Sequence, residues 1–379
     1  MESPILVTRP YLPPKEQFDR LTDEIWKNRW LTNNGPLLCR FEKALSSYLG
    51  LPEAALVTNG HLALDIAVKS LNLQGEVITT PFTFASTTHV LVQNHLTPVF
   101  CDIDEETLTL DPAKLEGLIN ERTSAILAVH VYGHPCHVEE IDRLAKKYKL
   151  KVIYDAAHAF GVQLKGKSIA EFGDVSAFSF HATKLFHSIE GGLLYAEDLG
   201  LRREFELQRN FGIENEILVS KTGGNAKMNE FQAAMGLLVL DQIDDLIRER
   251  ERLAERYVRN LTGVPGIRYC RPEAGEDFRF NYAYIPVRIL PEFGISRDVL
   301  YEFLKTKGIY TRRYFYPLTS EFACYKGRFS SHLTPVAKRV AEEILALPIY
   351  NGLSAEEVDY ICKNIRQARR DRSHFIMNV

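Results

Sequence analysis

Short apolar runs alternate with amphipathic segments between residues 54 and 196. Each run has about the length of a buried strand, and several segments between them show the helical spacing of apolar side chains. The runs that we expect to form strands are 54–58, 76–80, 97–102, 124–131, 151–155, 176–180 and 192–196. We expect helices over 61–71 and 138–148. This alternation predicts an α/β domain with a mostly parallel sheet flanked by helices, which binds ligands beyond the carboxyl ends of its strands.

The segment before this region has a different pattern. Residues 1–14 are rich in proline, and we expect them to form an extended arm. Amphipathic spacing predicts helices over 17–28 and 41–49, with Gly50 ending the second. The Asn-Asn-Gly-Pro sequence at 33–36 is a strong break between them.

The segment after this region predicts a second, smaller unit. A long helical pattern over 230–260 is followed by a strand-like run at 282–287 and helical patterns at 297–307 and 355–369. We therefore predict a large domain over residues 1–245, which includes the arm, and a smaller α+β domain over 246–379.

Composition and charge narrow the class of protein. The chain has 379 residues, 45% of them hydrophobic, and a net charge of −3, which is not typical of a dedicated nucleic-acid-binding protein. The six cysteines form no CxxC pair, and we recognise no secretory signal. No stretch approaches the ~20 apolar residues of a spanning helix. We expect a cytoplasmic protein with small-molecule substrates and neither nucleic-acid nor membrane partners.

An aspartate ends the apolar run at 151–155, in the sequence Val152-Ile-Tyr-Asp-Ala-Ala-His158. Asp155 is thus expected at the edge of the sheet where cofactors bind. An aspartate in this position can also cap the following turn through its side chain. The sequence leaves both interpretations open.

A single lysine follows the next strand, in Ser179-Phe-His-Ala-Thr-Lys184. Its neighbours are mostly apolar or small, and burial there would lower the pKa of the Lys184 amine and favour its neutral form. A neutral amine is the nucleophile that forms a Schiff base with an aldehyde cofactor. Ser179 and His181 offer a hydroxyl and an imidazole nearby. The alternative is an ordinary surface lysine.

Asp155 and Lys184 together suggest pyridoxal phosphate chemistry. This cofactor needs a lysine for its aldehyde and a carboxylate that keeps its pyridine nitrogen protonated. It also needs a phosphate site, and Thr58-Asn-Gly-His61 lies at a strand end that opens onto a helix N-terminus. Taken alone, that tetrapeptide is an ordinary turn.

The ordered motifs resemble those of the DegT/DnrJ/EryC1/StrS sugar-nucleotide aminotransferases over essentially the whole chain. The segments that carry the resemblance are 30–36, 58–60, 80–86, 130–133, 155–158, 179–184, 190–192, 225–230, 313–317 and 347–350. The resemblance implies the fold type I aminotransferase architecture and pyridoxal phosphate as the cofactor.

The resemblance also implies roles for individual residues. Lys184 would bind the cofactor aldehyde and carry protons, Asp155 would pair with the pyridine nitrogen, and Phe84 would stack on the ring. His158 would lie near the phenolic oxygen. The phosphate would be held by Gly60, His61 and Ser179, and Asn59 would also bind the cofactor. His61 departs from the family pattern, because many members carry a threonine there whose hydroxyl binds the phosphate.

A second subunit is implied by Asn225, which resembles the family asparagine that reaches the phosphate of the neighbouring subunit. We therefore expect a homodimer with composite active sites. The mixture of cations and aromatic rings at 312–317 suggests that Arg313, Tyr314 and Tyr316 bind the diphosphate, sugar or base of the substrate. A packed turn is the alternative for this segment.

The resemblance around the lysine also suggests which carbon atom of the sugar receives the amino group. The sequence Phe180-His-Ala-Thr-Lys184 is similar to members that act at C-4 of the sugar, especially those that use glutamate to aminate dTDP-4-keto-6-deoxyglucose. A C-3 aminotransferase of the same family is one alternative. A regulatory protein that binds the cofactor without catalysis is another, and we recognise no added DNA-binding segment that would favour it.

Two other clusters are expected to be structural. His130, His134, Cys136 and His137 lie close together but lack a metal-binding motif, so we expect a turn and no metal site. Arg248, Arg250, Arg252 and Arg256 alternate with glutamates, which predicts a solvated, ion-paired helix face.

Overall fold

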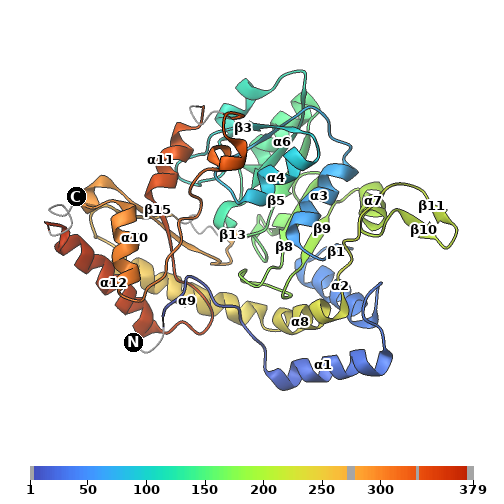
Figure 1. Cartoon of the computed structure of the whole chain (residues 1–379), viewed down its shortest axis with the longest axis horizontal. Coiled ribbons are helices and arrows are strands. Elements are labelled where there is room, and N and C mark those ends of the chain that lie inside the picture. The colour runs from blue at the N-terminus through green and yellow to red at the C-terminus, as the bar shows by residue number, and fades with distance from the viewer. Residues whose placement is uncertain (1–3, 271–277, 330–332, 374–379) are drawn as a thin grey trace.

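A seven-stranded sheet forms the centre of the computed structural model, which describes residues 4–270, 278–329 and 333–373. The strand order is β1-β9-β8-β5-β4-β2-β3 (Figure 1). The strands are β1 (Ala55–Val57), β2 (Glu76–Thr79), β3 (Thr97–Phe100), β4 (Thr123–Val129), β5 (Lys151–Asp155), β8 (Val175–Ser179) and β9 (Gly192–Tyr195). Strand β9 pairs antiparallel with both β1 and β8, while the other neighbours pair parallel. The predicted mostly parallel sheet is confirmed.

Helices cover both faces because successive side chains of the strands point to opposite sides. In β4, Leu127 and Val129 join the core beneath one layer of helices, and Ile126 and Ala128 join the core beneath another. The first layer is α3 (Gly60–Ser70), α4 (Ala85–Gln93) and α7 (Leu199–Arg209); the second is α5 (Pro112–Leu115) and α6 (Val138–Tyr148). A third core lies under α1 (Lys15–Asn28), α2 (Pro36–Leu49) and α8 (Glu230–Leu240).

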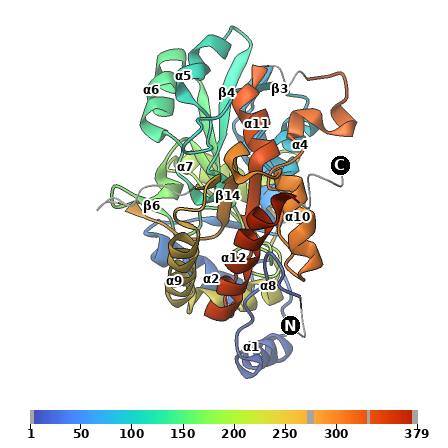
Figure 2. The same cartoon turned by 90° about the vertical axis from the view of Figure 1, so that its left-hand side faces the viewer.

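The C-terminal part has its own small sheet and apolar core. Strands β12 (Ile267–Tyr269), β14 (Ile285–Ile289) and β15 (Ile344–Leu347) form this antiparallel sheet. Helices α9 (Ile243–Leu261), α10 (Arg297–Thr306) and α12 (Ala355–Arg370) share its core, with α11 (Pro335–Glu343) just before β15 (Figure 2). The N-terminal arm joins this part, since Ile5 pairs with Ile309. The domain boundary at 245/246 falls within α9 and stays a prediction.

Two short sheets project from the main body. Strands β10 (Ile213–Asn215) and β11 (Leu218–Val219) form a hairpin at the right-hand edge of Figure 1. Strands β6 (Gln163–Leu164), β7 (Lys167–Ser168) and β13 (Phe278–Arg279) form the other. Neither was expected from the sequence, because strands of two or three residues leave no periodic pattern.

The single helix that the sequence predicts over 230–260 is wrong. The chain forms α8 and α9 instead, separated by Asp241 and Gln242. Helix α8 packs on α2, whereas α9 packs on α12, so the break redirects the chain between two cores. The strand expected at 282–287 also begins later, at Ile285, because Tyr282 has a φ of 51°, outside the range of a strand.

The predicted solvated face of α9 is only partly correct. Arg248 and Arg256 pair with Asp245 and Asp359. Arg250 is instead buried, and its guanidinium donates to the side chain of Asn351 at 2.9 Å and to the carbonyl of Ala283 at 3.3 Å. Among the described residues, no helix has the length and apolar character needed to cross a bilayer.

Candidate active site

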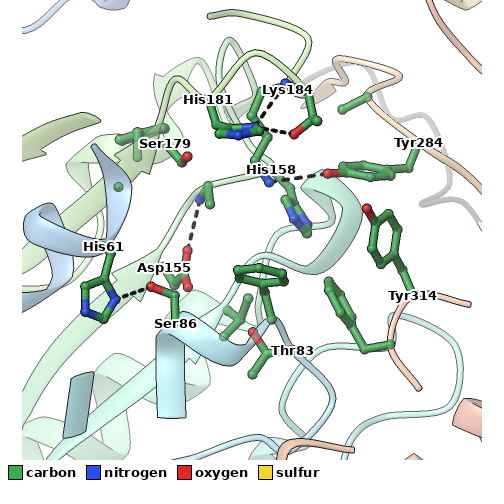
Figure 3. A pocket seen from close by; sticks show the side chains of 18 of the residues that line it. His61, Thr83, Ser86, Asp155, His158, Ser179, His181, Lys184, Tyr284 and Tyr314 are labelled. Carbon is green, nitrogen blue, oxygen red and sulfur yellow. Dashed lines mark hydrogen bonds between the residues drawn. The ribbon is translucent and has the colours of Figure 1, made fainter. Parts of the chain in front are cut away.

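Several strands of the large sheet deliver side chains to one cavity beyond their carboxyl ends. Asp155 ends β5, Ser179 ends β8, and Asn59 and Gly60 follow β1 at the start of α3. The cavity has a volume of about 580 Å³ and is walled on its other side by residues of the C-terminal part, including Tyr284. Figure 3 shows Asp155 and Lys184 facing this space between the two walls. This is the edge at which the sequence analysis expected a ligand.

Asp155 is buried and held by two hydrogen bonds. The hydroxyl of Thr87 donates to one carboxylate oxygen at 2.8 Å, and the backbone amide of Ala157 donates to the other at 3.1 Å. Asp155 therefore both caps the following turn and lines the cavity. Burial raises the pKa of its carboxyl, while the hydrogen bonds and the charge of Lys184 act in the opposite direction.

Lys184 reaches the cavity from the loop between β8 and β9. Its backbone amide donates to the carbonyl of His181 at 2.8 Å, and its Nζ lies 3.4 Å from the hydroxyl of Tyr284. Burial lowers the pKa of the amine to about 8, against the opposing effects of Asp155 and Tyr314. The direction of this shift is the one that the sequence predicts for a desolvated lysine. Lys184 and Asp155 each perturb the pKa of the other, so they share one electrostatic environment.

One end of the cavity is built from the start of α3. The Asn59 side chain accepts a hydrogen bond from the Leu62 amide at 2.9 Å and so caps this helix. The first amides of a helix have no partner within the helix and can bind an anion. A Cβ on Gly60 would lie 2.6 Å from the Cβ of Ser179, so only glycine lets α3 approach β8 this closely.

His61 lines the same end, but both nitrogens of its ring have partners within the chain. Nδ1 lies 2.6 Å from the hydroxyl oxygen of Ser86, and Nε2 lies 2.9 Å from the side-chain oxygen of Gln93. Ser86 also lines the cavity. Figure 3 shows His61, Ser86 and Ser179 on the side away from Tyr284 and Tyr314.

His158 and Phe84 also line the cavity. His158 is buried, its Nδ1 accepts a hydrogen bond from the Tyr132 amide at 3.0 Å, and burial holds the pKa of its ring well below the usual value. A neutral imidazole at this position therefore has its Nε2 available as a donor. Phe84 is 60% exposed although it is a large apolar residue, and it borders the cavity.

The predicted substrate residues do not all face the cavity of their own chain. Tyr314 lines it, and so does Arg312, which the sequence analysis did not select. Arg313 instead pairs with Asp298 at 3.0 Å and lies over the ring of Tyr301. Tyr316 lies under the guanidinium of Arg297. Roles for Arg313 and Tyr316 in substrate binding stay predictions.

Asn225 also lies outside the residues that wall this cavity. Its backbone pairs with Asn210, and its side-chain oxygen accepts a hydrogen bond from Lys227 at 2.8 Å. A role for Asn225 at the cofactor of its own chain has no support in this arrangement. Its expected role at a second subunit stays a prediction.

Tyr284 is the main site residue that sequence reasoning missed. Its hydroxyl contacts Lys184, and its ring centroid lies 4.6 Å from that of His158. Tyr284 stands immediately before β14, far along the chain from the lysine motif. No spacing rule connects the two segments, so only the fold could reveal the contact.

The glycines at 191–192 and the histidine cluster have structural roles. A Cβ on Gly192 would lie 2.7 Å from the carbonyl oxygen of Asn59, so this glycine allows β9 to pass the start of α3. His130 Nδ1 accepts from the Cys136 amide at 3.0 Å. Over the described ranges, no group of three or more His, Cys, Asp or Glu residues is arranged to hold a metal ion.

Comparison with known proteins places the chain in the family that its sequence motifs resemble. The model of the DegT/DnrJ/EryC1/StrS aminotransferase family matches residues 14–366. The chain belongs to this family. The fold type I architecture that the sequence resemblance implied is confirmed by solved structures of its aminotransferases.

Individual relatives in the family match over nearly their full length. A dTDP-4-amino-4,6-dideoxy-D-glucose transaminase of Shigella dysenteriae is 42% identical over 97% of this chain and 100% of that protein. A transaminase of the same name from Escherichia coli is 41% identical over 95% of this chain and 97% of that protein. The structure of DesI in the presence of its TDP-sugar product has a TM-score of 0.94 and 32% identity, covering 100% of this chain and 96% of that chain. The chain is thus an aminotransferase in family, length and fold.

Proposed function

We propose that this protein is a pyridoxal-phosphate-dependent aminotransferase that moves an amino group from L-glutamate to C-4 of a dTDP-linked 4-keto-6-deoxy sugar. The product would be dTDP-4-amino-4,6-dideoxyglucose. The observation that carries the proposal is the presence of Lys184 and Asp155 in one cavity, each perturbing the pKa of the other. The names of the 42% and 41% identical relatives support the sugar and the nucleotide.

The side chains that line the cavity have the chemistry needed to bind the aldehyde, the ring nitrogen and the phosphate of pyridoxal phosphate. A desolvated amine at Lys184 suits an aldehyde, and a buried carboxyl at Asp155 suits a protonated ring nitrogen. The open amides of α3 and the Ser179 hydroxyl suit a phosphate. Phe84 offers an exposed aromatic ring at the border of the same cavity, on which a pyridine ring could stack. When bound, the cofactor would supply a reactive aldehyde and a ring that withdraws electrons.

The residues of the chain would supply binding, orientation and proton transfer. With a pKa of about 8, the Lys184 Nζ can both accept and release a proton near neutral pH. Asp155 would hold a positive charge at the buried edge of the sheet, where Thr87 fixes the orientation of its carboxylate. The neutral ring of His158 would donate from Nε2 to an oxygen in the cavity. Tyr284 would orient the Lys184 amine between its uses as acid and base.

The substrate end would lie along the wall formed by the C-terminal part. Arg312 and Tyr314 line the cavity there, and an arginine suits a diphosphate while an aromatic ring suits a sugar or base face. We propose that these two residues meet the nucleotide-linked sugar. Arg313 would bind substrate only if it left its ion pair with Asp298. Tyr316 would bind substrate only if it left its contact with the guanidinium of Arg297.

We further propose a homodimer with composite sites. The β10–β11 hairpin lies at the edge of the molecule (Figure 1). It carries exposed apolar side chains, and Ile217 is 96% exposed. Exposed apolar clusters of this kind mark association surfaces. Asn225, just after the hairpin and outside its own cavity, would reach the phosphate of the partner. All six cysteines are free thiols, which supports a reducing cytoplasmic location.

The test combines the lysine variant with a substrate screen. Lys184→Ala should abolish turnover and the visible absorbance that the wild-type protein gains with pyridoxal phosphate. Incubating the wild type with glutamate and keto sugars linked to dTDP or UDP, followed by mass spectrometry and NMR, identifies the product. A product aminated only at C-3 would show that the enzyme acts at C-3 of the sugar and not at C-4. Retention of the cofactor spectrum with no reaction toward glutamate would instead favour a regulatory protein.

Mixing two inactive variants tests the composite site. If Asn225 acts in the partner's site, combining Lys184→Ala with Asn225→Ala subunits should restore about a quarter of the activity after subunit exchange, because one site in some dimers then has both residues. Failure of any mixture to regain activity, with dimers shown by light scattering, would contradict this arrangement.

A further inference from the structure

The hydroxyl of Ser86 is held by an imidazole rather than left free. The His61 Nδ1 lies 2.6 Å from Ser86 Oγ, and its Nε2 lies 2.9 Å from Gln93 Oε1. Both hydrogen bonds join α3 to α4. Because the carboxamide oxygen of Gln93 can only accept, the His61 Nε2 carries a proton in this arrangement.

The direction of the hydrogen bond between His61 and Ser86 then depends on the charge of His61. In the neutral ring, Nδ1 carries no proton and must accept, so the Ser86 hydroxyl donates its proton to His61. The serine oxygen then presents only lone pairs to the cavity. In the imidazolium, Nδ1 donates to Ser86, and the hydroxyl proton becomes free to donate to a ligand.

Ser86 lies where an anion would need that donor. It lines the cavity together with Gly60 and Ser179, at the end formed by the first turn of α3. Ser86 is itself in the first turn of α4, so two helix N-termini open toward this end. A phosphate dianion placed here is repelled by the lone pairs of a hydroxyl that has donated its proton elsewhere.

We infer that binding of the cofactor phosphate fixes a proton on His61 and thereby converts Ser86 from a hydrogen-bond acceptor into a donor to the phosphate. The proton comes from solvent to the Nδ1 of His61, and this N–H is the only bond that changes at the phosphate end of the cavity. This inference rests on the proposed function, since it takes pyridoxal phosphate as the ligand. It assigns Ser86 as a phosphate-binding residue and His61 as its positioning residue.

Asp65 and His89 are ionisable groups on the two helices that the hydrogen bonds of His61 join. On α3, Asp65 is one turn along, and its carboxylate is engaged by Lys69 at 2.7 Å and by Asn94 at 2.8 Å. On α4, His89 lies near His61. Burial, together with the charge of His61, lowers the pKa of the His89 ring. A phosphate at the end of the cavity would be the strongest nearby anion.

Proton uptake during cofactor binding is the direct test. The full-length apoprotein is titrated with pyridoxal phosphate by calorimetry at pH 8, in several buffers that differ in ionisation enthalpy. The wild type should take up close to one more proton than His61→Gln, which keeps a donor toward Ser86 but does not titrate. Between pH 7.5 and 8.5 the wild-type Kd should rise about tenfold more than that of the variant, the slope expected for one linked proton. Equal proton uptake by the two proteins would overturn the inference.

Two further variants keep the test decisive. Ser86→Ala should weaken cofactor binding about tenfold, the loss of one hydrogen bond to a charged group. Gln93→Glu places an anion against Nε2–H and should protonate His61 before binding, so proton uptake should fall toward that of His61→Gln. Uptake that stays at the wild-type value in Gln93→Glu would contradict the mechanism even if His61→Gln fails to fold.

A matched ligand separates this inference from the proposed function. Pyridoxal lacks the phosphate but keeps the aldehyde and ring, so wild type and His61→Gln should take up the same number of protons with it. If the wild type gains no visible absorbance with pyridoxal phosphate, the proposed function fails. If it gains that absorbance and reacts with glutamate while proton uptake matches His61→Gln, only the present inference fails.

Discussion

Glu230 lies so close to Gly35 that a Cβ at position 35 would be 2.5 Å from the carboxyl carbon. The same buried carboxylate accepts hydrogen bonds from the amides of Leu37 at 2.9 Å and Leu38 at 2.8 Å. The first residue of α8 thus stabilises the first turn of α2, where the helix macrodipole favours an anion.

This contact predicts a large loss of stability when it is removed. Glu230→Ala should lower the free energy of unfolding by about 3 kcal/mol, because it leaves two buried amides without a partner. Glu230→Gln keeps one acceptor and should cost about half as much. Urea titration followed by circular dichroism measures both. The exposed variant Glu216→Gln serves as the control and should change little, within about 0.5 kcal/mol. An equally small effect for Glu230→Ala would contradict the capping role.

The reactivity of Lys184 should rise with pH through about 8, because only the neutral amine is a nucleophile. The measurement is trapping of a small aldehyde on the apoprotein by borohydride, with the modified lysine identified by mass spectrometry. Asp155 raises the pKa of Lys184, so Asp155→Asn should move the midpoint to lower pH. A midpoint that stays near the usual lysine value in the wild type would show that the amine is not desolvated.

Removing the Tyr284 hydroxyl should slow the reaction with glutamate without weakening glutamate binding. That hydroxyl lies 3.4 Å from the Lys184 Nζ, and its loss leaves the amine less well oriented. Tyr284→Phe should lower the single-turnover rate about tenfold and change KM less than twofold. The exposed residue Tyr148 provides a matched control, since Tyr148→Phe should leave both values unchanged. A rise in KM alone would instead assign Tyr284 to substrate binding.

A buried arginine should stabilise the C-terminal part. Arg288 in β14 is 2% exposed, and its guanidinium pairs with Glu343 at 2.7 Å and with Glu105 at 2.9 Å. Arg288→Met should lower the free energy of unfolding by about 3 kcal/mol, because it leaves the partly buried Glu343 without its counter-charge. The exposed Arg248 pairs with Asp245, three residues earlier on α9, so Arg248→Met should cost about 0.5 kcal/mol or less. Similar urea midpoints for the two variants would contradict this difference.

Much of the large sheet could be predicted because its strands are short, apolar and separated by recognisable turns. The bounds of β5 and α6 agree with the sequence expectation at both ends. The antiparallel direction of β9 could not be predicted, because the apolar run at 192–196 has the same pattern in either direction. The break between α8 and α9 could not be predicted either, because it depends on which apolar core each helix joins, and the helical spacing continues across it.

In the candidate site, too, the sequence pattern does not show which side chains face the cavity. Arg312 and Arg313 are equivalent in sequence, but Arg312 pairs through its backbone with Ala346, and neighbouring side chains of extended chain point to opposite sides. That pairing sends Arg312 to the cavity and Arg313 to Asp298. Asp155 and Lys184 could be proposed from the sequence because the chemistry of pyridoxal phosphate requires both groups. The roles proposed for Tyr284 and Ser86 rest on contacts between segments far apart in the chain or on different helices.

The arm that pairs Ile5 with Ile309 has a consequence for biosynthesis. The amide of Ile349 donates to the carbonyl of Val7 at 3.1 Å, and Val7 and Thr8 both line the cavity. One wall of the cavity therefore joins residues translated first to residues translated near the end. A nascent polypeptide that has already extruded Lys184 and Asp155 from the ribosome still lacks this wall, so the finished pocket forms only after synthesis has passed residue 349.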